Sequence, residues 1–135
     1  MQAAPALNEA IAETRFIEMV FPDLANHYGT LYGGNALSLL GKSAFVTASR
    51  YARTAVVMAS SSHIAFERPV QVGQLLELVG TVVRVGRSSM TVEVAGFAEN
   101  LMSGARAVAL RGQFEMVAVD GDGRPTAIGA TPQQS

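Results

Sequence analysis

One long apolar segment, residues 35–53, is the feature that most limits how this chain can fold. Its apolar side chains recur at steps of three and four residues, the spacing of one helical face: Leu37, Leu40, Ala44, Ala48 and Tyr51. Leu39, Phe45 and Val46 lie off that stripe and are apolar too. A helix that is apolar on most of its sides is normally buried on most of them. The segment therefore predicts a helix that the rest of the chain must cover.

The rest of the chain predicts strands, because it is rich in β-branched residues and in alternating apolar positions. The expected strands are residues 14–21, 54–66, 74–85, 89–98 and 105–119. In the last of these we expect one face to carry Val108, Leu110, Phe114 and Met116. The order of one strand, one helix and then four strands does not alternate as in a βαβ protein. It predicts the α+β class, with an antiparallel sheet packed on one long helix. We expect one domain over residues 1–135, with flexible ends at residues 1–12 and 129–135.

Composition narrows the classes of function. Charged residues are 16% of the chain, below the roughly 25% of soluble domains, which suggests that another subunit covers part of the surface. Ten basic and eleven acidic residues give a net charge of −1, without the basic excess of a nucleic-acid binder. The chain has no cysteine, which excludes disulfides, thiolate metal sites and a cysteine nucleophile.

The sequence does not predict a secretory signal, a membrane span or a metal site. The N-terminal residues have no basic side chain before Arg15, unlike a secretory signal. No apolar run approaches the roughly 18 residues of a membrane span, so we expect a cytoplasmic protein with no membrane partner. His27 and His63 are not at a metal-ligand spacing, and no metal is expected.

Four blocks follow one another between residues 22 and 125. They read PDLANHYGTLYGG from Pro22, FERPVQVG from Phe66, GRSS from Gly86 and FEMVAVDGDGRP from Phe114. Together, in this order and spacing, they resemble the motifs of the acyl-CoA thioesterases of the hotdog superfamily, in particular the bacterial broad-specificity and cytosolic acyl-CoA hydrolases.

The resemblance implies a hotdog fold, a long helix wrapped by a curved antiparallel sheet. It implies a homodimer formed through sheet edges, with tetramers or hexamers as larger assemblies. The implied substrate is an acyl-CoA thioester, with coenzyme A as part of the substrate and no separate cofactor. The site would lie between the loop and helix start of one protomer and the strands of the other.

Two features of the first block fit thioester chemistry. Gly33 and Gly34 precede the predicted helix, whose first N–H groups lack intrahelical acceptors and can stabilise an oxyanion. Asn26 has an amide that both donates and accepts, and the resemblance implies that it orients the attacking water. The simpler interpretations are a tight glycine turn and an Asx-turn residue.

The general base is missing from its expected position. In the resembled enzymes an Asp or Glu follows the glycine pair after six residues, and here that position is Gly41. No Asp or Glu occurs between Asp23 and Glu67. The sequence alone predicts that Gly41→Asp creates or raises hydrolysis.

Three outcomes stay open. The protein has lost hydrolysis and kept acyl-CoA binding, or another group replaces the carboxylate, or a bound water suffices. The replacing group would be Asp23, Glu67 or His63, although a turn residue and a solvent-facing strand histidine are the simpler interpretations of Asp23 and His63. The water would be held by Asn26, Ser43 and the hydroxyls of residues 60–62. A hotdog module used only for assembly is a further hypothesis.

Basic and hydroxyl residues in the second and third blocks are candidates for holding the nucleotide of coenzyme A. Arginine recognises phosphate through a rigid fork, and a turn with small hydroxyl residues offers N–H groups to anions. The candidates are Arg68, Pro69, Arg87, Ser88 and Ser89. An ordinary solvated turn is the alternative for the third block.

Overall fold

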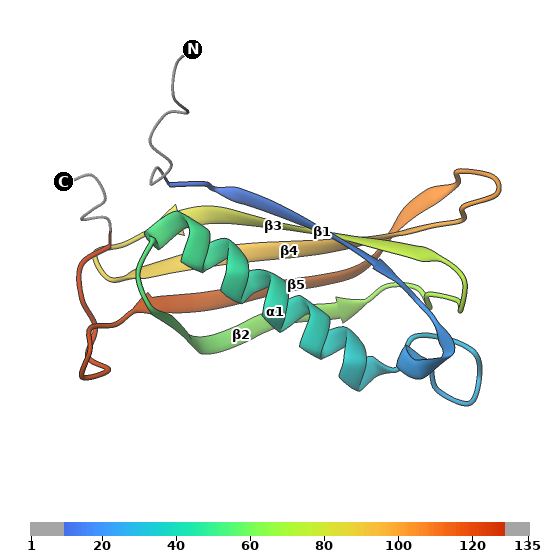
Figure 1. Cartoon of the computed structure of the whole chain (residues 1–135), viewed down its shortest axis with the longest axis horizontal. Coiled ribbons are helices and arrows are strands. Elements are labelled where there is room, and N and C mark those ends of the chain that lie inside the picture. The colour runs from blue at the N-terminus through green and yellow to red at the C-terminus, as the bar shows by residue number, and fades with distance from the viewer. Residues whose placement is uncertain (1–9, 129–135) are drawn as a thin grey trace, which may run out of the picture.

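A computed structural model describes residues 10–128 and shows one antiparallel sheet with a long helix lying across it (Figure 1). The sheet order is β1-β3-β4-β5-β2, so that β1 and β2 form its two edges. The elements are β1 Glu13–Met19, the short 3-10 helix η1 Pro22–Leu24, α1 Gly33–Ala52, β2 Val56–Phe66, β3 Leu75–Val85, β4 Ser89–Glu99 and β5 Arg106–Ala118. The predicted α+β class is confirmed, and the predicted bounds differ from these by two residues or fewer. The flexibility expected for residues 1–9 and 129–135 lies outside the described residues.

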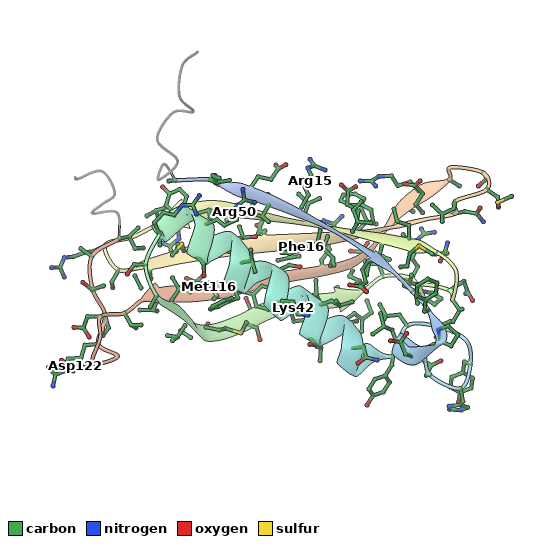
Figure 2. All side chains as sticks on the ribbon, viewed as in Figure 1. Arg15, Phe16, Lys42, Arg50, Met116 and Asp122 are labelled. Carbon is green, nitrogen blue, oxygen red and sulfur yellow. The ribbon has the colours of Figure 1, made fainter. Side chains whose placement is uncertain are left out.

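The core lies between α1 and the face of the sheet that the helix covers. Leu40, Ala44 and Ala48 of the helix are fully buried. On the sheet, alternate residues of each strand point to the same face. The buried residues of β3, β4 and β5 include Leu76, Leu78, Met90, Val92, Val94, Leu110, Phe114 and Met116. Figure 2 places Phe16 of β1 and Met116 of β5 along this interface. The 3.6-residue and two-residue periods of the sequence therefore specify the two surfaces that meet.

One flank of the helix stays open in the single chain, although the sequence predicted burial on most sides. Leu37 and Phe45 are 47% and 48% exposed, and Met58 and Phe66 of the neighbouring edge strand β2 are 43% and 49% exposed. The five strands cover one broad side of α1 and end at β2, so the flank beyond this edge has no strand over it. We call these four side chains the open flank.

The face predicted for β5 is wrong at one residue because the strand contains an irregularity. Leu110 pairs with Gly96, and Val108 pairs with Phe97, so Ala109 is an extra residue between two consecutive pairs. Such a bulge shifts the alternation by one position. Val108 therefore shares the face of Phe97, away from the helix, instead of the face of Leu110.

Within residues 10–128, no helix combines the length and apolar content that crossing a membrane requires.

Candidate active site

The start of α1 presents unused backbone donors. Ala36 N–H donates to the carbonyl oxygen of Tyr32 at 2.9 Å, so the N–H groups of residues 33–35 precede the first intrahelical bond. Tyr32 is the N-cap and makes no side-chain cap hydrogen bond to the described residues. The positive end of the helix dipole lies at the same place. Gly34 is exposed, so an oxygen atom of a ligand can reach this turn.

Two aromatic rings flank this glycine corner, which we define as Gly33 and Gly34. A Cβ atom added to Gly34 would meet Tyr32 Cε2 at 2.5 Å, and one added to Gly33 would lie 3.6 Å from Phe66 Cε2. The absence of side chains at both positions keeps the backbone within reach of a ligand. Phe66 comes from the end of β2, so the corner lies beside the open flank.

Asn26 organises the loop before the helix. Its side-chain oxygen Oδ1 accepts hydrogen bonds from Tyr28 N–H at 2.9 Å and from the N–H and the hydroxyl of Thr30, both at 3.2 Å. The loop is tied to the helix because Asn35 Nδ2 and Tyr32 N–H both donate to the carbonyl oxygen of Leu24. Among residues 10–128, no acceptor is found for Asn26 Nδ2, which leaves a donor for a ligand or water.

Met58 lies beside Gly41, the position at which the carboxylate is missing. A Cβ atom built on Gly41 would lie 3.5 Å from Met58 Cε. Leu37 and Phe45 precede and follow Gly41 by one helical turn, and both belong to the open flank. The surroundings of Gly41 are therefore apolar. Met58 was not predicted as a site residue, because it lies on a different element from Gly41 and no spacing within either element links the two.

Ser43 lies on the other side of the helix. It is 2% exposed, and its hydroxyl donates to the carbonyl oxygen of Leu39 at 2.8 Å. Its own carbonyl oxygen accepts from the Thr47 hydroxyl, which packs against Gly80 of β3. The structure thus places Ser43 in the core facing the sheet and does not bring it to Gly41. Residues 60–62 are exposed on β2, where they pair with residues 113–115 of β5.

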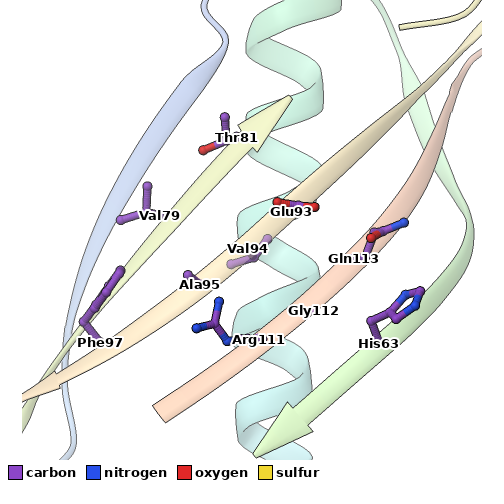
Figure 3. A pocket seen from close by; sticks show the side chains of 10 residues that line it. All are labelled: His63, Val79, Thr81, Glu93, Val94, Ala95, Phe97, Arg111, Gly112 and Gln113. Atoms are coloured by element: carbon purple, nitrogen blue, oxygen red, sulfur yellow. The ribbon is translucent and has the colours of Figure 1, made fainter. Parts of the chain in front are cut away.

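His63 lies on the sheet face opposite the helix. It has a positive φ of 55° at an irregularity of β2, between the pairs made by Ser62 and Ala65. Figure 3 shows its ring on β2 at one side of a hollow that Arg111, Gln113 and Glu93 also line, with the helix behind the sheet. These side chains line a hollow of about 270 Å³. Within one chain, the structure does not bring His63 to the glycine corner.

The two carboxylates considered as replacements have other surroundings. Asp23 is exposed in η1, and Glu67 accepts a hydrogen bond from Arg111 Nε at 2.7 Å. Neither contacts Gly41 in the structure, so a role for either stays a prediction.

The candidates for nucleotide binding fall at opposite ends of the molecule. Arg68 and Pro69 line a hollow of about 460 Å³ at the end of the sheet near the glycine corner. Their segment is joined to the glycine loop, because Leu31 N–H donates to Val70 O at 2.8 Å. Among residues 10–128, the Arg68 guanidinium has no carboxylate partner, so it is available to an anion.

The turn with Arg87, Ser88 and Ser89 lies at the other end of β2. Ala118 N–H donates to Ser88 O at 2.8 Å, and Ala118 pairs with Val56 at the start of β2. Phe66, at the end of that strand, lies beside the glycine corner. Eleven strand residues separate the two places by about 30 Å. One chain alone therefore does not bring the two groups of candidates together.

A charged network on the outer sheet face reaches the hollow that Arg68 and Pro69 line, because Arg106 belongs to both. The Glu77 carboxylate forms ion pairs with the guanidinium groups of Arg106 at 2.6 Å and Arg15 at 3.2 Å. The Arg106 guanidinium is the larger cause that holds the pKa of Glu77 below its ordinary value. The same pairing with Glu77 raises the pKa of Arg15. This network stabilises the sheet face and has no contact with the glycine corner.

The helix wrapped by an antiparallel sheet, with a glycine corner at the helix start, defines a hotdog protein of the thioesterase type. A sequence model of the thioesterase superfamily matches residues 28–105. The chain belongs to this superfamily.

Individual relatives agree with this membership. An uncharacterized acyl-CoA thioester hydrolase of Zymomonas mobilis is 38% identical over 125 residues, which are 93% of this chain and 80% of that protein. An acyl-CoA hydrolase structure from Agrobacterium tumefaciens has a TM-score of 0.79 at 41% identity and is matched over 95% of this chain. This chain spans only about half of that protein, 48%.

Two further solved structures carry information on ligands and assembly. An apo-hexameric acyl-CoA thioesterase has a TM-score of 0.85 at 34% identity, over 94% of this chain and 84% of that one. The acyl-CoA hydrolase of Staphylococcus aureus, in complex with butyryl coenzyme A, has a TM-score of 0.82 at 29% identity, over 91% and 76%. Variants of the latter replace one asparagine, one aspartate or one threonine by alanine.

Proposed function

We propose that this chain is an acyl-CoA thioester hydrolase with an atypical site, formed between two copies of the chain. The observation that carries the proposal is the glycine corner, where uncapped N–H groups meet an exposed backbone at the positive end of α1. Donors held at such a place stabilise the negative charge that develops on a carbonyl oxygen. The named activities of the relatives support the same reaction.

A second copy completes the site through β2. The open flank is apolar and lies beside this edge strand, and strand edges with apolar neighbours are normally covered. If two copies of β2 pair antiparallel, the turn at residues 86–89 of the second copy comes to the glycine-corner end of the first. Its Arg87 would then join Arg68 around the phosphates of coenzyme A. The hexameric state of one relative supports an assembly of several copies of this chain.

The proposed reaction uses water and the thioester. The corner N–H groups hold the carbonyl oxygen while a water molecule, bound through Asn26 Nδ2, attacks the carbonyl carbon. A C–O bond forms, the C–S bond breaks, and the electron pair leaves with sulfur. The proton that the water loses ends on the thiol of coenzyme A.

This site lacks a group to take that proton at once. A positioned general base contributes roughly 10²–10⁴-fold to a rate, and α1 contains no carboxylate. We therefore expect hydrolysis slower by about that factor than in a site that has the base.

Acyl-CoA binding without hydrolysis is the second candidate, and the contact between Gly41 and Met58 favours it. The asparagine, aspartate and threonine replaced in the S. aureus variants stand fifteen and then seventeen positions apart. Asn26, Gly41 and Met58 have the same spacing. By this correspondence the asparagine is retained, whereas both later polar residues are replaced by nonpolar ones that lie next to each other. The cytoplasmic location expected from the sequence stays a prediction.

The experiment combines a binding titration with a hydrolysis assay. A non-hydrolysable thioether analogue of an acyl-CoA is titrated into the protein, and release of free thiol is followed for a panel of acyl-CoAs. We expect stabilisation by about 2.7 kcal/mol at one hundred times Kd. Slow thiol release identifies the hydrolase, and binding without release at any chain length identifies the second candidate. No thermal shift with any acyl-CoA would leave only the assembly module.

A further inference from the structure

We propose that Gly41 and Met58 form one coupled unit, in which Met58 blocks the space that a carboxylate at position 41 would need. This inference rests on the proposed function and concerns the same site. It changes the expectation from sequence alone, by which Gly41→Asp is sufficient to create hydrolysis.

Met58 limits the space for a side chain at position 41. Because Met58 Cε lies 3.5 Å from the ideal Cβ position of Gly41, the first side-chain atom at position 41 would already be in van der Waals contact. The carboxylate carbon and oxygens of an aspartate extend beyond that atom. On the side where Met58 Cε lies, they would compete with the thioether for the same space.

The side chains around position 41 on the open flank also lack hydrogen-bond donors for a carboxylate. Met58 offers a methyl group and a thioether, which is only a weak hydrogen-bond acceptor. Leu37 and Phe45, one turn away on either side of position 41, offer none. Where the proposed second copy covers this flank, a carboxylate among these groups loses hydration without gaining a donor from them, which is costly and disfavours the charged form needed in a base. Gly41 and Met58 are thus compatible with each other, whereas a carboxylate and Met58 are not.

A smaller residue at position 58 would free the space beside position 41. Alanine removes the atoms that contact position 41, and threonine removes most of them and adds a hydroxyl donor. In either background, the carboxylate can accept the proton of the attacking water and later transfer it to the departing sulfur of coenzyme A. The two positions should therefore depend on each other, as neighbouring residues commonly do.

The test compares the wild type with Gly41→Asp, Met58→Ala, Met58→Thr and the two double variants. Acyl-CoA hydrolysis is measured by thiol release, binding by titration of the thioether analogue, and folding by thermal unfolding. We expect Gly41→Asp alone to raise hydrolysis by less than about tenfold and the double variants to raise it by about 100-fold or more. Each double variant should exceed the product of its single variants by at least about tenfold.

Val57→Ala is the matched control on the same strand. Val57 is also about half exposed, but its side chain points to the opposite face of β2. Gly41→Asp combined with Val57→Ala should behave as Gly41→Asp does alone.

Two results would overturn the coupling. One is a rate for Gly41→Asp alone that equals the rates of the double variants. The other is double variants that fold and bind the analogue but show no excess rate, which leaves the proposed function intact. If the wild type and all variants fold without binding the analogue, the proposed function fails and the coupling fails with it.

Discussion

The ring of Tyr32 lies over Gly34, close enough that a Cβ atom at position 34 would meet Tyr32 Cε2 at 2.5 Å. Tyr32 is also the N-cap of α1 and is 54% exposed. The ring therefore covers the same helix turn whose N–H groups we assign to the carbonyl oxygen of the substrate. Because the ring is exposed, it can rotate aside when a ligand enters.

The role of the Gly34 N–H is tested by two substitutions, of which only one keeps this N–H. Gly34→Ala and Gly34→Pro both add a Cβ atom under the Tyr32 ring, but only proline removes the N–H. Proline is tolerated in the first turn of a helix. Loss of one oxyanion donor costs about 10²–10³-fold in rate, so Gly34→Pro should fall below Gly34→Ala by that factor in the thiol-release assay. If hydrolysis by the wild type is too slow to measure, the two Gly34 substitutions are compared in the Gly41→Asp/Met58→Thr variant.

Equal rates for the two folded variants would exclude Gly34 N–H from the reaction. Thermal unfolding of both variants ensures that the comparison concerns the site and not the fold.

The close packing of the helix on the sheet predicts a stability change at Gly80. Thr47 Oγ1 occupies the place of a Cβ atom at position 80, and Ser43 O lies 3.4 Å from it. Overpacking a filled core costs about 1–3 kcal/mol, so Gly80→Ala should lower the free energy of unfolding in urea by this amount. Gly121→Ala is the control, because a Cβ atom there has no described atom within 4 Å. Equal effects of the two substitutions would contradict the described packing.

The open flank predicts the assembly. A charge buried without a partner in an apolar interface is strongly unfavourable, so Phe45→Glu should shift the protein towards monomers in sedimentation velocity. Met102→Glu introduces the same charge at an apolar residue that is 96% exposed in the connection between β4 and β5, and it should leave the assembly intact. A Phe45→Glu protein that keeps the wild-type assembly would place the interface elsewhere.

The network around Glu77 predicts a dependence of stability on pH. Because Arg106 and Arg15 lower the pKa of Glu77, its ionised form stabilises the folded state above the ordinary glutamate range of about pH 4.3. That contribution is lost as the pH falls through the lowered pKa. Glu77→Gln should therefore cost up to about 1 kcal/mol at pH 7 and less at pH 3, measured by urea unfolding.

Glu93→Gln serves as the comparison for this prediction. Glu93 is exposed on the same sheet face and makes no ion pair with the described residues. A Glu77→Gln effect that grows at low pH, or one equal to that of Glu93→Gln at pH 7, would contradict the assigned role of the network.

Much of the fold follows from local sequence pattern. The apolar stripe around Leu40 and Ala44 predicts the helix, and the alternation of Met90, Val92 and Val94 predicts the inner face of β4. The bulge at Ala109 was not predictable, because an extra residue in one strand depends on the register with its partner and leaves no period of its own. Val108 was assigned to the wrong face for this reason.

The site was predictable only in part. The glycine corner and Asn26 follow from short motifs, and the position of the missing carboxylate follows from a spacing within one helix. The contact of Gly41 with Met58 joins two elements seventeen residues apart, so periodicity within either element does not indicate it. His63 and Ser43 were candidates by residue type, and only the three-dimensional structure shows that they face away from the glycine corner.

The most direct test of the account is a crystal structure of the protein with a non-hydrolysable acyl-CoA analogue. We expect the acyl carbonyl oxygen about 2.7–3.1 Å from a corner N–H group, and the phosphates between Arg68 and the residue 86–89 turn of a second copy. A well-ordered analogue bound elsewhere, with the glycine corner empty and no second copy beside β2, would contradict the account.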